Sequence, residues 1–181
     1  ARIVRAGVAV PKRSEGMKRQ RNPENPVFCE AKSHPKNKNL KLDICPINIK
    51  EKDHDNKLKK LLEEIKKLLT QNSKNIDERF FGNNSFSLVS LCNGNIQGFS
   101  AYYKISNSLC EIFLYISPEL IDQPEELKLL EKLISVARGN GFETLKVCLE
   151  NLTEHEMYIC KRKGFREETS SDTRTVLYKH I

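Results

Sequence analysis

Residues 112–126 have the sequence I-F-L-Y-I-S-P-E-L-I-D-Q-P-E-E. It begins as an apolar strand and passes through a loop without glycine into an amphipathic helix from Pro124 onward. Such a connection normally points free backbone N–H groups at a phosphate bound at the helix start. Here the loop carries four carboxylates, and the first basic residue after it is Lys128. We therefore expect this helix start to repel phosphate.

Outward from this stretch, periodicity predicts the other elements. The clearest helix has apolar residues at 58, 61, 62, 65, 68 and 69, which form one stripe. Strands at 86–92 and 96–103 form a hairpin, because Asn93-Gly94 tolerates the positive φ angles of a type I′ turn. The other expected elements are strands at 40–47, 109–116, 142–149 and 175–180, and helices at 124–137 and 154–162. The resulting order is β α β β β α β α β.

With this order, five short motifs resemble the GNAT superfamily of N-acetyltransferases over residues 40–181. They are the Asn93-Gly94 hairpin followed by Gly98-Phe99, Leu114-Tyr115-Ile116-Ser117-Pro118-Glu119, Leu129-Leu130-Glu131, Gly141-Phe142 and Lys163-Gly164-Phe165. The resemblance implies an α/β (α+β) fold, in which helices flank a mixed, mainly antiparallel sheet that is splayed near its middle. Residues 1–39 are expected to form a basic N-terminal arm and linker outside this domain.

In the GNAT superfamily, the strand end that matches Leu114, Tyr115 and Ile116 pairs with the pantetheine arm of acetyl-CoA. A loop of the pattern R/Q-x-x-G-x-G/A then wraps the pyrophosphate. In this chain, residues 121–126 depart from that pattern at every characteristic position. We interpret them as helix-start residues, with Asp122 as the cap, Pro124 in the first turn, and Glu125 and Glu126 at the positive end of the helix dipole. We thus expect no cofactor; acetyl-CoA enters only if the protein is active.

The resemblance also implies candidates for proton transfer. The family commonly places a tyrosine four residues before the glycine that matches Gly164, and that position here is Cys160, with Tyr158 two residues earlier. Glu111, in the central strand, matches a region that often holds a general base. The structural alternatives are that Cys160 packs under the sheet, that Tyr158 is half-buried, and that Glu111 faces outward. We favour the first two and leave the role of Glu111 open.

The charge is concentrated at the N-terminus. Residues 1–21 contain seven cations against the single acid Glu15, which gives +6 of the formal charge of +7. The cations are Arg2, Arg5, Lys12, Arg13, Lys18, Arg19 and Arg21. No aromatic residue accompanies them, so the segment suits contact with a phosphate backbone and not base stacking. A solvated tail, an organelle-targeting remnant and a nuclear localisation patch remain alternatives.

Other site classes find little support. Cys29, His34, Cys45 and His54 lack the close cysteine pair of a typical zinc site, so we expect no metal. The cysteines lie mostly in apolar runs, so we expect them to be reduced. No interpretable nucleophile motif accompanies the histidines, which argues against a hydrolase. No apolar run approaches the length of a membrane span, so we expect no membrane contact.

We therefore expect a pseudoenzyme: a non-catalytic GNAT-like interaction subunit whose arm, residues 1–21, binds RNA in a ribonucleoprotein particle with other protein subunits. A mitochondrial ribosome, and hence the mitochondrial matrix, is favoured over cytoplasm or nucleus. One alternative is a divergent acetyl-CoA-dependent N-acetyltransferase. The other is a protein-binding regulator similar to the ornithine decarboxylase antizymes, since the L-Y-I strand end, the following helix and the Gly-Phe pair are loosely similar to theirs.

Overall fold

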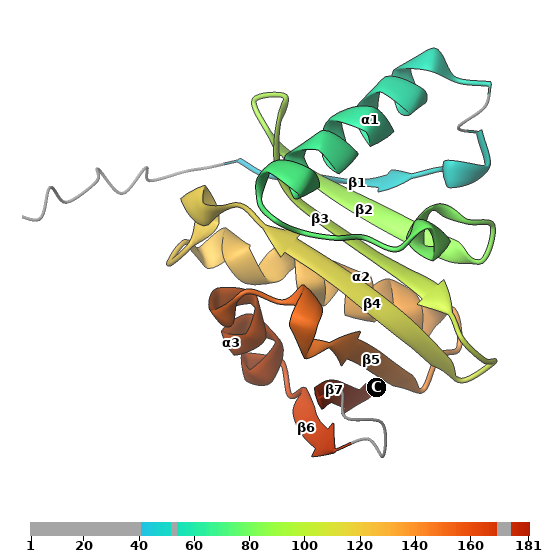
Figure 1. The fold of residues 1–181 in the computed structure, drawn as a ribbon, viewed down its shortest axis with the longest axis vertical. Helices are drawn as coiled ribbons and strands as arrows, with labels where there is room; N and C mark the ends of the chain where they lie inside the picture. The colour runs from blue at the N-terminus through green and yellow to red at the C-terminus, as the bar shows by residue number, and fades with distance from the viewer. Residues whose placement is uncertain (1–40, 52–53, 170–174) are drawn as a thin grey trace, which may run out of the picture. The chain divides into compact units, whose positions relative to one another are not determined.

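The computed structural model describes residues 41–51, 54–169 and 175–181. Helices cover both faces of one seven-stranded sheet, whose strand order is β1-β2-β3-β4-β5-β7-β6 (Figure 1). The strands are β1 (Asp43–Ile47), β2 (Ser85–Cys92), β3 (Asn95–Lys104), β4 (Leu109–Ile116), β5 (Thr144–Cys148), β6 (Arg166–Thr169) and β7 (Thr175–His180). The α-helices are α1 (Asn56–Gln71), α2 (Lys128–Gly139) and α3 (Glu154–Arg162). Short 3-10 turns occur at Ile49–Glu51, Glu78–Phe81, Pro118–Leu120, Pro124–Leu127 and Leu149–Asn151.

Helix α1 confirms the expected apolar stripe. Asp55 caps its start, because the Asp55 carboxylate accepts from the N–H groups of Lys57 and Leu58 at 2.8 and 3.3 Å. The stripe buries Leu62, Ile65 and Leu69. They pack in one core cluster with the β3 and β4 aromatics Phe99, Phe113 and Tyr115.

A second core cluster occupies the other face of the sheet. Leu129, Leu130 and Leu133 of α2 join Ile159 and Cys160 of α3 in this cluster. The two helices approach the sheet from the side opposite to α1, and each contributes one buried stripe. The two clusters thus make a three-layer α/β/α arrangement.

The sheet is splayed in its middle. β4 pairs along β3, from Gly98 opposite Ile116 to Lys104 opposite Cys110. On its other side β4 runs parallel to β5, and they pair only across Leu109–Glu111. Among the strands of the described residues, none pairs with the carboxyl half of β4 on that side, as the sequence resemblance implied. The position at which the strands separate is where the candidate site lies.

The structure corrects some element boundaries. The Asn93-Gly94 turn has the expected positive φ angles, 51° and 81°. The helix expected from Pro124 begins instead as a 3-10 turn and becomes α-helical at Lys128. β6 was missed, because its alternation is too short to be recognised in sequence; it pairs antiparallel with β7. In the described part of the chain, no helix has both the length and the apolar character needed to cross a bilayer.

Candidate functional site

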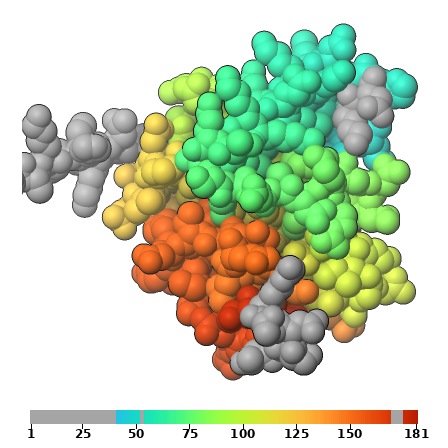
Figure 2. Space-filling model, viewed as in Figure 1, coloured from blue at the N-terminus to red at the C-terminus, as the bar shows by residue number. Residues whose placement is uncertain are grey.

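A notch lies between the carboxyl end of β4 and the amino end of α3, and its hollow measures about 370 Å³. In Figure 2 the segment after β4 (yellow) meets α3 (orange) and α1 (green) on one face of the molecule. Tyr115 and Ile116, two of the three residues expected to line a pantetheine arm, form one wall of the notch. The third, Leu114, is fully buried in the core under α2. The full lining is Asn72, Lys74, Tyr115, Ile116, Pro118, Ile121, Thr153, Glu154, His155 and Glu156.

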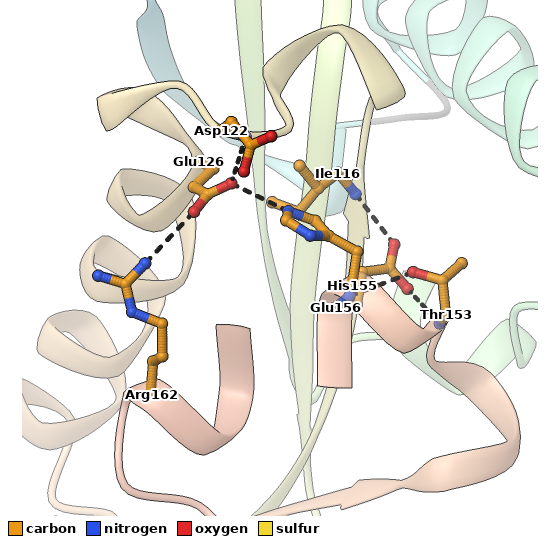
Figure 3. Close-up of polar contacts among 7 residues, drawn as sticks. All are labelled: Ile116, Asp122, Glu126, Thr153, His155, Glu156 and Arg162. Atoms are coloured by element: carbon orange, nitrogen blue, oxygen red, sulfur yellow. Dashed lines mark hydrogen bonds and ion pairs between the residues drawn. The ribbon is translucent and has the colours of Figure 1, made fainter. Parts of the chain in front are cut away.

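Glu156 occupies the free edge of β4. Its side chain is buried, and the backbone N–H of Ile116 donates to its Oε1 atom at 3.1 Å (Figure 3). The N–H of Thr153 donates to Oε2 at 2.9 Å, and the Glu156 N–H donates to the Thr153 hydroxyl at 3.2 Å. This reciprocal pair is a capping box that starts α3. The same carboxylate therefore caps a helix and takes a strand N–H that β5 leaves unpaired.

Lys74 neutralises this buried carboxylate. Its ammonium group pairs with Glu156 and also donates to the carbonyl oxygen of Asn151. The ammonium lies 5.4 Å from the centre of the Phe113 ring, which adds a cation–π contact. Because Lys74 follows α1, this ion pair joins the end of α1 to the start of α3 across the end of β4.

Glu126, in the loop after β4, is a second buried carboxylate that accepts from a backbone N–H. Its carboxylate is buried and accepts from the backbone N–H of Asp122 at 3.0 Å (Figure 3). The same carboxylate pairs with His155 Nε2 at 2.9 Å and with the Arg162 guanidinium at 3.5 Å. An internal anion thus lies at the loop, held by one backbone N–H and two cationic or polar side chains from α3.

The helix-start interpretation needs correction in its details. Asp122 was expected to cap the helix, but it adopts a positive φ of 63° and serves as an N–H donor to Glu126. Neither Gln123, at the cap of the 3-10 turn, nor Leu127, at the cap of α2, makes a side-chain capping bond. Asp122 lies one residue before the cap position Gln123, and the Glu126 carboxylate reaches back to accept from the Asp122 N–H.

The other N–H groups of the loop are also occupied. Those of Glu119 and Leu120 donate to the Ser117 hydroxyl and carbonyl at 3.3 and 2.9 Å. The N–H groups of Ile121 and Gln123 donate to the carbonyls of Pro118 and Leu120. Every backbone N–H from 119 to 123 therefore has an acceptor within the chain.

Two of the backbone donors that coenzyme A would use are already bonded within the chain. A pantetheine arm needs the free N–H groups of the splayed strand, and a pyrophosphate needs free N–H groups at the helix start. Here Glu156 takes the N–H of Ile116 and Glu126 takes that of Asp122. A phosphate placed in the loop would also lie beside carboxylates, which opposes binding.

Glu111 is buried and does not face outward, contrary to the structural alternative drawn from the sequence. The Tyr103 hydroxyl donates to its carboxylate at 2.8 Å, the Cys148 thiol lies at 3.5 Å, and the Lys146 ammonium at 3.9 Å. Burial, reinforced by Glu111, raises the pKa of the Tyr103 phenol and raises that of the Cys148 thiol to about 11. Glu111 thus sits among protonated neighbours where the sheet begins to splay.

Tyr158 and Cys160 differ strongly in how far their side chains are buried. Cys160 is fully buried in the α2-side core, and this burial raises its pKa to about 12. Tyr158 is 54% exposed, more than the half-buried position expected of it. Its ring lies against His155 and under the Arg162 guanidinium. Glu111 contacts Tyr103 of the opposite core cluster, so the structure does not bring the three expected proton-transfer residues together.

The residues that fill the notch were missed in the sequence. The start of α3 does carry a local signal, since Thr153 and Glu156 have the spacing of a capping box. Lys74 carries no such signal, because its partner lies 82 residues away.

The remaining expected sites lie wholly or partly outside the described residues. The basic arm lies outside the described residues, and so do Arg2, Arg5, Lys12, Arg13, Lys18, Arg19 and Arg21. Of the four residues considered for zinc, Cys29 and His34 also lie outside them. Within the described ranges, no group of three or more His, Cys, Asp or Glu side chains is arranged to hold a metal ion.

The chain is similar to solved structures, but the comparisons by sequence find no match. No family model matches the chain, and no curated protein matches it. GCN5 from Tetrahymena is similar with a TM-score of 0.63 and 17% identity, over 77% of this chain and 96% of that one. A GNAT-family acetyltransferase from Staphylococcus aureus gives 0.57 and 16%, over 77% and 99%. A putative acyl-CoA N-acyltransferase from Klebsiella pneumoniae gives 0.56 and 17%, over 79% and 99%. Together with the splayed sheet, these likenesses show that the chain has the GNAT fold.

Proposed function

We propose that this protein is a GNAT-fold pseudoenzyme that acts as an interaction subunit and does not transfer acetyl groups. The observation that supports this most is the pair of internal carboxylates in the cofactor position. Glu156 binds the N–H of Ile116, and Glu126 binds the N–H of Asp122. Both side chains are buried, so their hydrogen bonds are shielded from water.

Electrostatics argues that the cofactor cannot easily displace these groups. A diphosphate would have to compete with the Glu126 carboxylate for the Asp122 N–H, and that carboxylate is also held by His155 and Arg162. The two like charges would also repel each other. Moving Glu156 aside would leave the Lys74 ammonium buried without its partner.

The proposed partner of the arm is RNA in a ribonucleoprotein particle, and we favour a mitochondrial ribosome in the mitochondrial matrix. Seven cations within residues 1–21 can each contact a phosphate, which gives affinity without sequence specificity. In this proposal the folded domain contacts neighbouring protein subunits, and the arm follows the RNA.

Two measurements test the proposal. Isothermal titration of the full chain with acetyl-CoA should give no saturable heat, whereas binding in the micromolar range or tighter would remove the claim of a lost cofactor site. Sedimentation of ribonucleoprotein particles should lose the protein when residues 1–21 are deleted. Unchanged association of the truncated chain would remove RNA as the partner of the arm.

A divergent N-acetyltransferase remains the second candidate, because Glu111 is buried beside Tyr103 at the splay. In that case Glu111 would take the proton of the attacking amine, and the cofactor would have to bind without the loop N–H groups. Turnover of acetyl-CoA against a panel of amines, lost in Glu111→Gln, would establish this candidate. Absence of turnover in the unmodified chain would exclude it for those amines.

A protein-binding regulator on a silent copy of the fold is the third candidate. The exposed side chains of Ile121 and Tyr158 beside the notch favour it, because such apolar surface suits a protein partner better than RNA. Affinity purification that yields one enzyme partner without RNA would support it over the ribonucleoprotein proposal.

A further inference from the structure

Exposed apolar side chains gather around the notch. Among the described residues, three large hydrophobic side chains are exposed: Ile105 at 44%, Ile121 at 39% and Tyr158 at 54%. Ile121 lines the notch directly. The Tyr158 ring lies 6.2 Å from the ring of His155, which lines it as well. Ile105 lies elsewhere, in the turn between β3 and β4, and serves below as a control.

The walls of the notch are apolar, while its rim offers acceptors. Tyr115, Ile116, Pro118 and Ile121 provide the apolar wall. The backbone N–H groups of Ile116, Asp122 and Glu119 are already bonded to Glu156, Glu126 and Ser117. A ligand that fits must therefore bring apolar groups for the wall and donors for the rim.

The rim is also negatively charged. Glu154 lines the notch, and Glu119 and Asp122 directly follow the lining residues Pro118 and Ile121 in sequence. All three acids are exposed, and none has a cationic partner within 4.0 Å in the described part of the chain. The nearby cations Lys74 and Arg162 are already paired with Glu156 and Glu126. This charge pattern repels phosphate and attracts lysine or arginine.

We propose that the notch, with Ile121 and Tyr158, binds a short segment of a partner protein that combines an apolar side chain with flanking Lys or Arg residues. The apolar side chain enters the hollow of about 370 Å³ and packs on Ile121 and Tyr158. Its basic neighbours meet Glu119, Asp122 and Glu154. The inference rests on the proposed loss of the cofactor site, since coenzyme A would occupy the same hollow.

Synthetic peptides test this directly. A labelled peptide of alternating Leu and Lys should bind the full chain in a fluorescence anisotropy titration. Any binding of a matched peptide of alternating Leu and Glu should be unaffected by substitutions in the notch. Ile121→Ser and Tyr158→Ser should each weaken binding of the Leu and Lys peptide by about tenfold or more, because each removes apolar area that the bound peptide would cover. The double variant Glu119→Gln with Glu154→Gln should weaken it and reduce its dependence on salt.

Ile105→Ser is the matched control, because it removes an exposed apolar side chain away from the notch. Its affinity for the peptide should equal that of the unmodified chain. The inference is overturned if the Leu and Lys peptide does not bind, or if Ile105→Ser weakens it as much as Ile121→Ser. It is also overturned if Ile121→Ser leaves peptide binding unchanged but weakens binding of an RNA oligonucleotide. The same holds if it leaves peptide binding unchanged but weakens self-association measured by sedimentation.

A parallel titration with coenzyme A separates this inference from the proposed function. If neither coenzyme A nor the peptide binds, only the docking site is wrong. If coenzyme A binds in the notch, both the docking site and the loss of the cofactor site are wrong.

Discussion

Glu156 is the residue on which the site depends most. It joins three segments, because its carboxylate binds the N–H of Ile116, the N–H of Thr153 and the ammonium of Lys74. Both charged side chains are more than nine-tenths buried, so the pair is not screened by solvent. The local fold at the end of β4 therefore depends on this one carboxylate.

Glu156→Ala should lower the free energy of unfolding by about 3–5 kcal/mol, because it leaves the Lys74 ammonium buried and unpaired. Urea unfolding followed by circular dichroism measures this change. Glu154→Ala, two residues earlier in the same helix and exposed, should change stability by about 0.5 kcal/mol or less. Equal effects of the two substitutions would show that the buried pair does not hold the site.

The buried thiols should be inert in the folded protein. Burial raises the pKa of Cys110 and of Cys160 to about 12, so neither forms the reactive thiolate at about pH 8. Iodoacetamide followed by peptide mapping should therefore modify the exposed Cys45 first, and Cys110 and Cys160 only in denaturant. Rapid labelling of Cys160 in the native chain would contradict its place in the core.

The same thiols make stability depend on pH in the alkaline range. Their pKa values are higher in the folded than in the unfolded chain, so the unfolded chain loses protons first as the pH rises. Stability should be fully present below the unfolded pKa of about 8.5 and decline above it. Thermal unfolding across this range measures the decline, and a melting temperature that rises with pH there would contradict it.

At the scale of the elements, β3 lies close to α2 and to its neighbouring strands at Gly98. A Cβ atom there would lie 2.8 Å from Leu129 Cδ2, 2.8 Å from Ser90 Oγ and 3.0 Å from the Tyr115 carbonyl oxygen. Gly98→Ala should therefore destabilise the protein by about 1–3 kcal/mol through overpacking. Gly139→Ala is the control, because nothing lies within 4 Å of its Cβ position. It should leave stability unchanged or raise it by up to about 1 kcal/mol, and urea unfolding compares the two.

The elements that could be predicted from sequence are those fixed by local signals. The apolar stripe of α1 and the Asn93-Gly94 turn depend on neighbouring residues alone, and both are confirmed. The sequence predicted that carboxylates of the loop would accept its N–H groups, but not which carboxylate. Glu126 and not Asp122 is the acceptor. That choice depends on His155 and Arg162 of α3, which approach Glu126 only after the chain folds. Long-range contacts of this sort leave no periodic pattern.

In the whole molecule, residues 1–21 carry +6 of the formal charge of +7, so the proposed RNA contact lies in this segment. Deleting residues 1–21 should reduce the slope of log affinity against log salt for single-stranded RNA by about 5, given seven phosphate contacts. Fluorescence anisotropy over a range of salt concentrations measures the slope. Neutralising the exposed α1 lysines Lys59, Lys60 and Lys67 is the control and should change it much less. A slope that falls equally in both variants would argue against the arm as the specific RNA contact.

The central claim is that the chain's own carboxylates hold the N–H groups that coenzyme A would need. Nuclear magnetic resonance of the ¹⁵N-labelled full chain, titrated with millimolar coenzyme A, tests it at the two amides concerned. The Ile116 and Asp122 resonances should not shift, because Glu156 and Glu126 remain bound to these two N–H groups. Saturable shifts of both resonances at micromolar coenzyme A would contradict it.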